Sequence, residues 1–189
     1  MNDESAYTIC MLKPDTHEDI LGGMVIRDIE DGGLKVIFRK DLVLNQERAE
    51  LIYSEHKESP NMRHAVKSLL GDDKNNFTTL LIIKSLDGGD ALKKMQALKG
   101  RSDLRGIRFK YRRIVGEEFT GERREDELLK NRLHVPDSNV LASEIINDLL
   151  DKSEIEEIRQ REPELFREAF IEHHELVKIN PENNGFKIK

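Results

Sequence analysis

The residues of this chain best suited to chemistry lie in two short stretches that are far apart in sequence. Asn131, His134 and the turn Pro136-Asp137-Ser138 form one stretch, and Lys13-Pro14-Asp15 forms the other. A histidine can attack phosphorus because one of its ring nitrogens carries no proton near neutral pH. The reaction also needs a cation beside the phosphoryl oxygens, and Lys13 can supply a point charge. We therefore predict that the fold brings Lys13 next to His134.

Other side chains can complete a site for phosphate and sugar. Arg105 and Arg108 offer planar fork donors for phosphate, and Asn131 is a neutral donor suited to a ribose hydroxyl. Tyr53 can hold the lysine or the histidine. The two arginines belong to a basic run, however, and such a run is commonly a solvated face. The remaining histidines of the first hundred residues show no partner in the sequence; they are His17, His56 and His64.

The composition bounds the class of protein. The 189 residues, 37% of them hydrophobic, suffice for one domain with a sizeable core and an appendage. A formal net charge of −6 argues against nonspecific binding to nucleic acid or anionic membranes. No apolar run approaches the length of a membrane span, and the polar N-terminus does not resemble a signal peptide. The single cysteine, Cys10, indicates a reducing, cytoplasmic compartment and a buried packing thiol.

Apolar periodicity predicts the elements that must position these residues. Strands are expected where apolar β-formers cluster, and helices where apolar residues recur three and four positions apart. The predicted strands are residues 6–13, 34–44, 77–84 and 107–115. The predicted helices are residues 20–31, 46–57, 60–70 and 90–99. In the last predicted strand, Ile107, Phe109 and Tyr111 alternate with basic residues.

The resulting order, β-α-β-α-α-β-α-β, predicts an α+β fold. We expect a ferredoxin-like βαββαβ sandwich, in which helices cover one face of an antiparallel sheet. A doubly wound parallel sheet is the alternative, because the order of elements alone does not exclude it.

The composition changes after the last predicted strand. Residues 116–130 are charged and short of core residues, which predicts an inserted surface loop or exposed helix. Further helices are expected over residues 143–150 and 155–177, with a break at Pro163, before a loose end at residues 180–189. The chain therefore divides into a domain at residues 1–150 and a helical C-terminal extension at residues 151–189. We expect this Glu/Arg-rich extension to be exposed or to pack on a neighbouring subunit.

Three motifs together resemble those of the nucleoside diphosphate kinase family. The first is Lys13-Pro14-Asp15 followed by Leu21-Gly22-Gly23. The second is Tyr53 ahead of Ser59-Pro60, and the third is Asn131-x-x-His134 followed by Asp137-Ser138. They occur in order on the expected elements, and the resemblance covers about residues 6–150.

The resemblance implies a ping-pong phosphotransfer. The histidine of this family takes the γ-phosphate of a nucleoside triphosphate and passes it to a nucleoside diphosphate, with Mg²⁺ bound through the nucleotide phosphates rather than at a protein metal site. His134 would then be the nucleophile, and Glu144 would orient its ring. The resemblance also implies a homo-oligomer with nucleoside triphosphates and diphosphates as partners. It assigns nucleotide binding to Lys13, Tyr53, Arg105, Arg108 and Asn131.

The chain departs from the family pattern at several positions of the site. Val135-Pro136 replaces Gly-Ser, which removes a hydroxyl beside the histidine. Gln96 stands where a helix of the family offers an arginine to the phosphates, and Asn61 stands where an aromatic side chain stacks on the base. The loop after Gly100, which in the family contributes to contacts between subunits, is shorter than usual. These departures support an alternative: a nucleotide-binding family member with weak or no phosphotransfer that acts as a regulatory or assembly protein.

Overall fold

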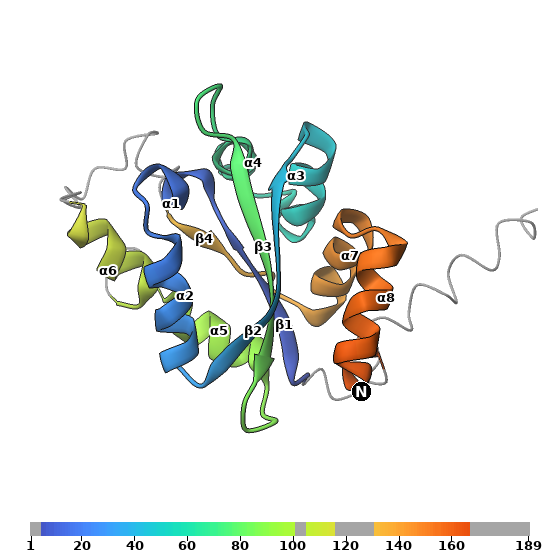
Figure 1. Cartoon of the computed structure of the whole chain (residues 1–189). Coiled ribbons are helices and arrows are strands. Elements are labelled where there is room, and N and C mark those ends of the chain that lie inside the picture. Colours follow the sequence, from blue (N-terminus) through green and yellow to red (C-terminus); the bar gives the residue numbers. More distant parts are fainter. Residues whose placement is uncertain (1–4, 101–104, 116–130, 167–189) are drawn as a thin grey trace, which may run out of the picture.

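A four-stranded antiparallel sheet forms the centre of the protein (Figure 1). The computed structural model describes residues 5–100, 105–115 and 131–166. The strands lie in the order β2-β3-β1-β4. Their bounds are Tyr7–Leu12 for β1, Leu34–Val43 for β2, Phe77–Ser85 for β3 and Leu133–His134 for β4. This order and the antiparallel pairing of every neighbour confirm the predicted ferredoxin-like βαββαβ class.

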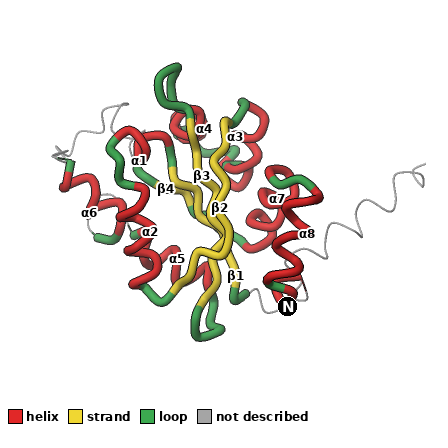
Figure 2. The backbone as a smooth tube through the Cα atoms, viewed as in Figure 1, coloured by secondary structure: helices red, strands yellow, loops and turns green. Residues whose placement is uncertain are grey.

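Helices cover both faces of the sheet (Figures 1 and 2). The first face carries α2 (Gly22–Asp31), α5 (Ala91–Lys99) and α6 (Ile107–Ile114), and the short α1 (Pro14–Glu18) follows β1. The second face carries α3 (Gln46–Ile52), α4 (Met62–Leu70), α7 (Asn139–Leu149) and α8 (Lys152–Arg161). Two 3-10 turns lie at Ser54–His56 and Pro163–Phe166. The two long helices of the βαββαβ core, α2 and α5, share one face as predicted, whereas the additional helices cover the face expected to be open.

Alternation along β1 explains why both faces are covered. Ile9 and Met11 point into the core under α3, α4, α7 and α8, whereas Cys10 and Leu12 point into the core under α2, α5 and α6. All six residues of β1 are buried, so the strand reads as a continuous apolar run. Cys10 is a buried free thiol, as predicted, and burial raises its pKa to about 12.

The prediction of a last strand over residues 107–115 is wrong, because this segment forms helix α6. The alternation of apolar and basic residues that suggests a strand also fits a helix. Ile107 and Tyr111 are four residues apart, lie on one side of α6 and are both buried. The fourth strand is instead β4, which has only two residues and carries His134.

Helix α8 packs on the sheet of its own chain, which differs from the expectation that the extension is exposed or lies on another subunit. Its Ile158 is 4% exposed, and Leu165 in the following 3-10 turn is fully buried. The Asp151 side chain caps the helix and forms a reciprocal capping box with Glu154. The predicted break at Pro163 coincides with the end of α8.

Two charged pairs and one hydrogen bond join this helix and its C-cap residue Glu162 to three strands, and we call these contacts together with Ile158 the α8 seam. Lys40 of β2 lies 2.6 Å from Glu154, and Lys84 of β3 lies 2.7 Å from Glu162. Tyr7 of β1 donates its hydroxyl to the same Glu162 at 3.2 Å. The helix therefore crosses the sheet instead of extending away from it.

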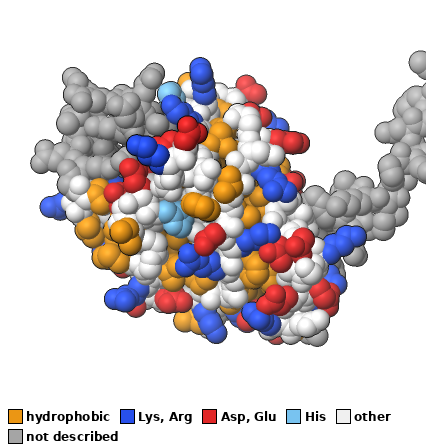
Figure 3. Space-filling view, turned by 45° about the horizontal axis from the view of Figure 1, so that its top comes forward, with side chains coloured by type: hydrophobic (Ala, Val, Ile, Leu, Met, Phe, Trp, Pro, Cys, Tyr) orange, Lys and Arg blue, Asp and Glu red, His pale blue; other side chains and the backbone are white. Residues whose placement is uncertain are grey.

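The described surface mixes charges of both signs. On the face seen in Figure 3, Lys and Arg side chains are interspersed with Asp and Glu side chains. Within the described ranges, no helix is both long and apolar enough to cross a lipid bilayer. The predicted insertion at residues 116–130 and the end of the chain after residue 166 lie outside the described residues.

Candidate active site

A cleft of about 310 Å³ opens beside β4, between α4 and its neighbouring 3-10 turn on one side and α5 and α6 on the other. Its wall is polar and contains three histidines and two cations. The lining residues are Tyr53, His56, Asn61, His64, Ala65, Lys99, Arg108, Asn131, His134, Val135 and Asp137.

The pairing of β4 with β1 brings the two predicted stretches together. His134 lies opposite Met11, and Leu133 lies opposite Leu12. The sheet continues for one more hydrogen bond, because the Lys13 amide donates to the Arg132 carbonyl at 2.9 Å. Lys13 thus leaves β1 at the level where the His134 segment enters the sheet, as the sequence predicts.

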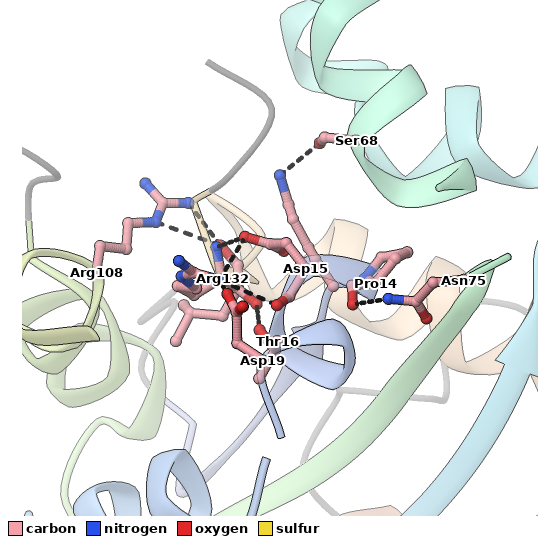
Figure 4. Close-up of polar contacts among 10 residues, drawn as sticks. Pro14, Asp15, Thr16, Asp19, Ser68, Asn75, Arg108 and Arg132 are labelled. Atoms are coloured by element: carbon pink, nitrogen blue, oxygen red, sulfur yellow. Dashed lines mark hydrogen bonds and ion pairs between the residues drawn. The ribbon is translucent and has the colours of Figure 1, made fainter. Parts of the chain in front are cut away.

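The Lys13 side chain is buried behind the wall of the cleft. Its ammonium donates to the Ser68 hydroxyl at 2.6 Å (Figure 4). Ser68 in turn donates to the Ala65 carbonyl at 2.6 Å. The same ammonium lies 5.5 Å from the centre of the Tyr53 ring. The Tyr53 ring packs against His134 with ring centres 4.5 Å apart in an edge-on arrangement. Tyr53 therefore contacts both the lysine and the histidine.

Two further cations reach the cleft from α5 and α6. Lys99 is in the last turn of α5, and Arg108 donates to the Leu133 carbonyl at 2.7 Å from Nη2 and 3.3 Å from Nε. Gly100 and Gly106 allow these helix ends to meet. Both glycines have left-handed φ angles, 62° and 88°, and a β-carbon at Gly100 would stand 2.1 Å from the Arg105 carbonyl oxygen. A close approach that only glycine permits therefore places Lys99 and Arg108 on one wall.

The turn after the histidine is tied to the 3-10 turn after α3. Glu55 accepts from the Asp137 amide at 3.0 Å and from the Ser138 hydroxyl. The carboxylate of Asp137 lies 3.0 Å from Nε2 of His56. Ser138 caps α7 by accepting from the Leu141 amide at 3.1 Å, so the turn also starts a helix.

The electrostatics of the cleft favour a neutral His134 ring. Burial is the main cause that holds the pKa of His134 well below its usual range, and the neighbouring Lys13, Arg108 and Lys99 act in the same direction. The ring is 4% exposed, and its Nε2 has no hydrogen-bond partner among the described residues. Oδ1 of Asn131 is likewise buried and has no such partner. Burial also lowers the pKa of Lys99, with Arg108 contributing.

The structure brings together most of the residues predicted for the site. His134, Tyr53, Asn131 and Arg108 line the cleft, and Lys13 lies directly behind Tyr53. Two predicted residues lie elsewhere. Arg105 is exposed and is not among the lining residues, and Glu144 is half-buried on α7 with no hydrogen bond to His134 in the described part of the chain.

Several residues of the cleft were not predicted from the sequence. Lys99 precedes Gly100 at the end of a helix, where a lysine normally interacts with the helix dipole and gives no signal of a site. His56 and His64 showed no partner in the sequence, yet both line the cleft and His56 is paired with Asp137. Gln96, which stands where an arginine was expected, donates to the Pro136 carbonyl at 3.3 Å.

The fold and the site define an α+β protein with a histidine on the wall of a cationic cleft, a class suited to phosphate chemistry. The sequence model of the nucleoside diphosphate kinase family matches residues 6–155. The chain belongs to the nucleoside diphosphate kinase family.

Individual relatives agree with this membership. The nucleoside diphosphate kinase of Erythrobacter litoralis is 28% identical over 153 residues, which cover 78% of this chain and 95% of that protein. The nucleoside diphosphate kinase of Beijerinckia indica is 30% identical over 115 residues, which cover 58% of this chain and 77% of that protein.

Solved structures show the same fold. The nucleoside diphosphate kinase of Aquifex aeolicus superposes with a TM-score of 0.57 at 19% identity, covering 78% of this chain and 96% of that one. The enzyme of Halobacterium salinarum in complex with CDP gives a TM-score of 0.54 at 22% identity, covering 79% of this chain and 90% of that one.

Proposed function

We propose that the protein is a nucleoside diphosphate kinase that works by a ping-pong mechanism through phospho-His134. The observation that carries this proposal is a buried, neutral imidazole on the wall of a cleft that also holds Lys99 and Arg108, with Lys13 directly behind. A neutral ring has a nitrogen lone pair for attack on phosphorus, and the cations offset the charge of the phosphoryl oxygens.

In the first half-reaction, a ring nitrogen of His134 attacks the γ-phosphorus of a nucleoside triphosphate. A phosphorus–nitrogen bond forms, the bond from the γ-phosphorus to the β,γ-bridging oxygen breaks, and the nucleoside diphosphate leaves. In the second half-reaction, a terminal β-phosphate oxygen of another nucleoside diphosphate attacks the same phosphorus and frees the histidine. A Mg²⁺ ion held by the nucleotide phosphates would supply further positive charge to offset that of the phosphoryl oxygens.

The remaining residues are assigned by their positions around the cleft. Tyr53 fixes one face of the His134 ring, and the Asn131 amide is available to a sugar hydroxyl. We also assign Arg105 to phosphate binding and Glu144 to orienting the His134 ring. Neither lines the cleft, so both roles require these side chains to move when the nucleotide binds.

A second candidate function is nucleotide binding with weak or no phosphotransfer. The observation that favours it is the absence of a hydrogen-bond partner for Nε2 of His134 among the described residues, because a nucleophilic histidine is normally oriented through its second nitrogen. Such a protein would serve as a regulatory or assembly protein.

A labelling experiment separates the two candidates. The protein is incubated with γ-labelled ATP and Mg²⁺, and acid-labile, base-stable label on the protein is measured. We expect label in the wild type and in His17→Gln, a histidine outside the cleft, and none in His134→Ala. Adding a nucleoside diphosphate should then discharge the label. Nucleotide binding without label in the wild type would contradict the kinase proposal and favour the binding protein.

We further propose that the catalytic domain spans residues 1–150 and the helical extension residues 151–189, and that the protein is a cytoplasmic homo-oligomer. Its partners are then nucleotides and copies of itself, not nucleic acid or a membrane. Light scattering on the full chain tests the oligomer, because a monomer at micromolar concentration would contradict it.

A further inference from the structure

Arg132 lies between Asn131 and His134 in sequence, yet its side chain turns away from the cleft. It is fully buried, the largest side chain of the described residues with that property, and it is not among the residues that line the cleft. The proposed reaction gives it no role. A buried arginine without a chemical role needs a physical explanation, because removing this charge from water is costly.

The contacts of Arg132 join it to the Lys13-Pro14-Asp15 loop and α1 (Figure 4). Its amide donates to Oδ2 of Asp15 at 2.9 Å, and its Nη1 donates to the Asp15 carbonyl at 3.0 Å. Nη1 also pairs with the carboxylate of Asp19. The Arg132 carbonyl accepts from the Lys13 amide at 2.9 Å and from the Thr16 hydroxyl. Backbone and side chain together are therefore fixed to one short segment of the chain.

The backbone at Arg132 is strained. Its φ angle is 71°, in the left-handed region, and the Leu133 amide donates to the Asn131 carbonyl at 2.8 Å across it. A hydrogen bond that spans one residue with positive φ is a γ-turn of the rare and strained kind. A residue other than glycine keeps such a conformation only when its surroundings enforce it, and strain of this kind clusters at functional sites.

The turn determines how Asn131 and His134 face the cleft. Asn131 is the first residue of the γ-turn and Leu133 is its third, so His134 follows the turn directly, and a different turn would rotate the side chains of Asn131 and His134 relative to each other. A buried ion pair is weak evidence for stability, since apolar replacements of similar size are often neutral. The network around Arg132 is better explained as a conformational lock.

We propose that Arg132, held by Asp15 and Asp19, is a positioning residue that sets the His134 ring against the incoming phosphate. This proposal rests on the proposed function for its kinetic consequence, but its structural part does not. A misplacement of about 1 Å at a reacting group can cost about 100-fold in rate. The lock is thus expected to affect the transfer step more than the binding of nucleotide.

The test uses the full chain with Arg132→Met, Asp19→Asn and the control Arg39→Met, which breaks an exposed ion pair with Asp41 in β2. We expect the single-turnover rate of phosphate transfer to His134 to fall about 10- to 100-fold in the first two variants, with the nucleotide Kd changed less than about threefold. In NMR spectra without nucleotide, the His134 ring signals should shift, whereas those of His64 on the opposite wall should not. Arg39→Met should match the wild type in every measurement.

Three results would overturn the proposal. The first is wild-type transfer rates in both variants. The second is a parallel loss of transfer, nucleotide binding and melting temperature, which would make the role merely structural. The third is unchanged His134 ring signals in both variants, which would contradict the lock even if the wild type transfers no phosphate. Absence of transfer in the wild type would by itself contradict only the proposed function. Should Arg132→Met not fold, Asp19→Asn still tests the lock, because it keeps Arg132 and its contacts with Asp15.

Discussion

Two polar regions flank the same sheet, and they differ in whether their polar groups have partners within the chain. In the α8 seam, each carboxylate meets a cation: Glu154 meets Lys40, and Glu162 meets Lys84. In the cleft, Nε2 of His134 and Oδ1 of Asn131 are buried without a hydrogen-bond partner among the described residues. The seam satisfies its polar groups within the chain, whereas the cleft does not.

This difference separates residues that hold the fold from residues available to a ligand. Leaving a buried polar atom unpaired costs about 1–3 kcal/mol, so each of these two atoms is stabilised if a ligand in the cleft pairs with it. Paired, partly exposed charges in the seam contribute little each, and the buried side chain of Ile158 supplies most of its stabilisation. The comparison predicts that changes in the cleft alter activity and changes in the seam alter stability.

The largest expected effect is that of Lys13→Met on phosphoryl transfer. Lys13 is buried directly behind the cleft wall, and removing a fixed cation next to the place where charge develops lowers the rate about 100- to 1,000-fold. The single-turnover rate of His134 phosphorylation from Mg-ATP measures this. The matched control is Lys110→Met, which removes an equally charged side chain from an exposed pair with Asp28 and should leave the rate unchanged. A Lys13→Met protein with a normal rate would break the comparison.

The next effect is that of Ile158→Ala on the free energy of unfolding. The side chain is 4% exposed in the core under α8, so its truncation should cost about 2–4 kcal/mol. Urea unfolding measures the loss. The transfer rate of the variant, measured where it is fully folded, should stay within about twofold of the wild type. A loss of transfer without a loss of stability would show that the seam acts on the site.

The smallest effect is a dependence of stability on pH that comes from the cleft. Burial and the neighbouring cations hold the pKa of His134 well below its usual range, whereas the unfolded chain titrates near about 6.5. Because the folded-state pKa is depressed, the contribution of His134 to stability is fully present above the unfolded value of about 6.5. The contribution falls as the pH drops from this unfolded value toward the folded-state pKa, by about 1.4 kcal/mol per pH unit at most.

Comparing the wild type with His134→Gln tests this sign. The free energy of unfolding of the wild type should fall more steeply than that of the variant between about pH 6.5 and the folded-state pKa. Parallel curves for the two proteins would indicate a ring that titrates alike in the folded and unfolded states, which contradicts its burial.

The sequence predicted the strands that have strong patterns and missed the one that carries the site. Residues 6–13, 34–44 and 77–84 were placed within one residue of β1, β2 and β3 at either end, because apolar β-formers cluster in each of them. Strand β4 has two residues, too few to form a pattern. Helix α6 was mistaken for it, since a short helix with buried residues four apart can also alternate by twos.

The site could be predicted mainly where motifs name its residues. Lys13, Tyr53 and His134 belong to motifs. In the fold, the Tyr53 ring lies between the other two and contacts both of them. The neighbourhood of Lys99 depends on a tight glycine contact between two helix ends, and that of Arg132 on a strained turn. Neither has a signature in a single sequence, because both arise from tertiary geometry.

The pairing of β4 with β1 also determines the stage of folding at which the cleft is completed. Arg132 and Asp15 are separated by 117 residues, whereas β2 and β3 pair along most of their length without any help from β4. Closing so long a loop costs entropy, which favours nearer contacts first. A chain emerging from the ribosome can therefore form three strands of its sheet while it still lacks the cleft residues from Asn131 to Asp137. The cleft is therefore completed only when the His134 segment pairs with β1, after the first three strands can already form.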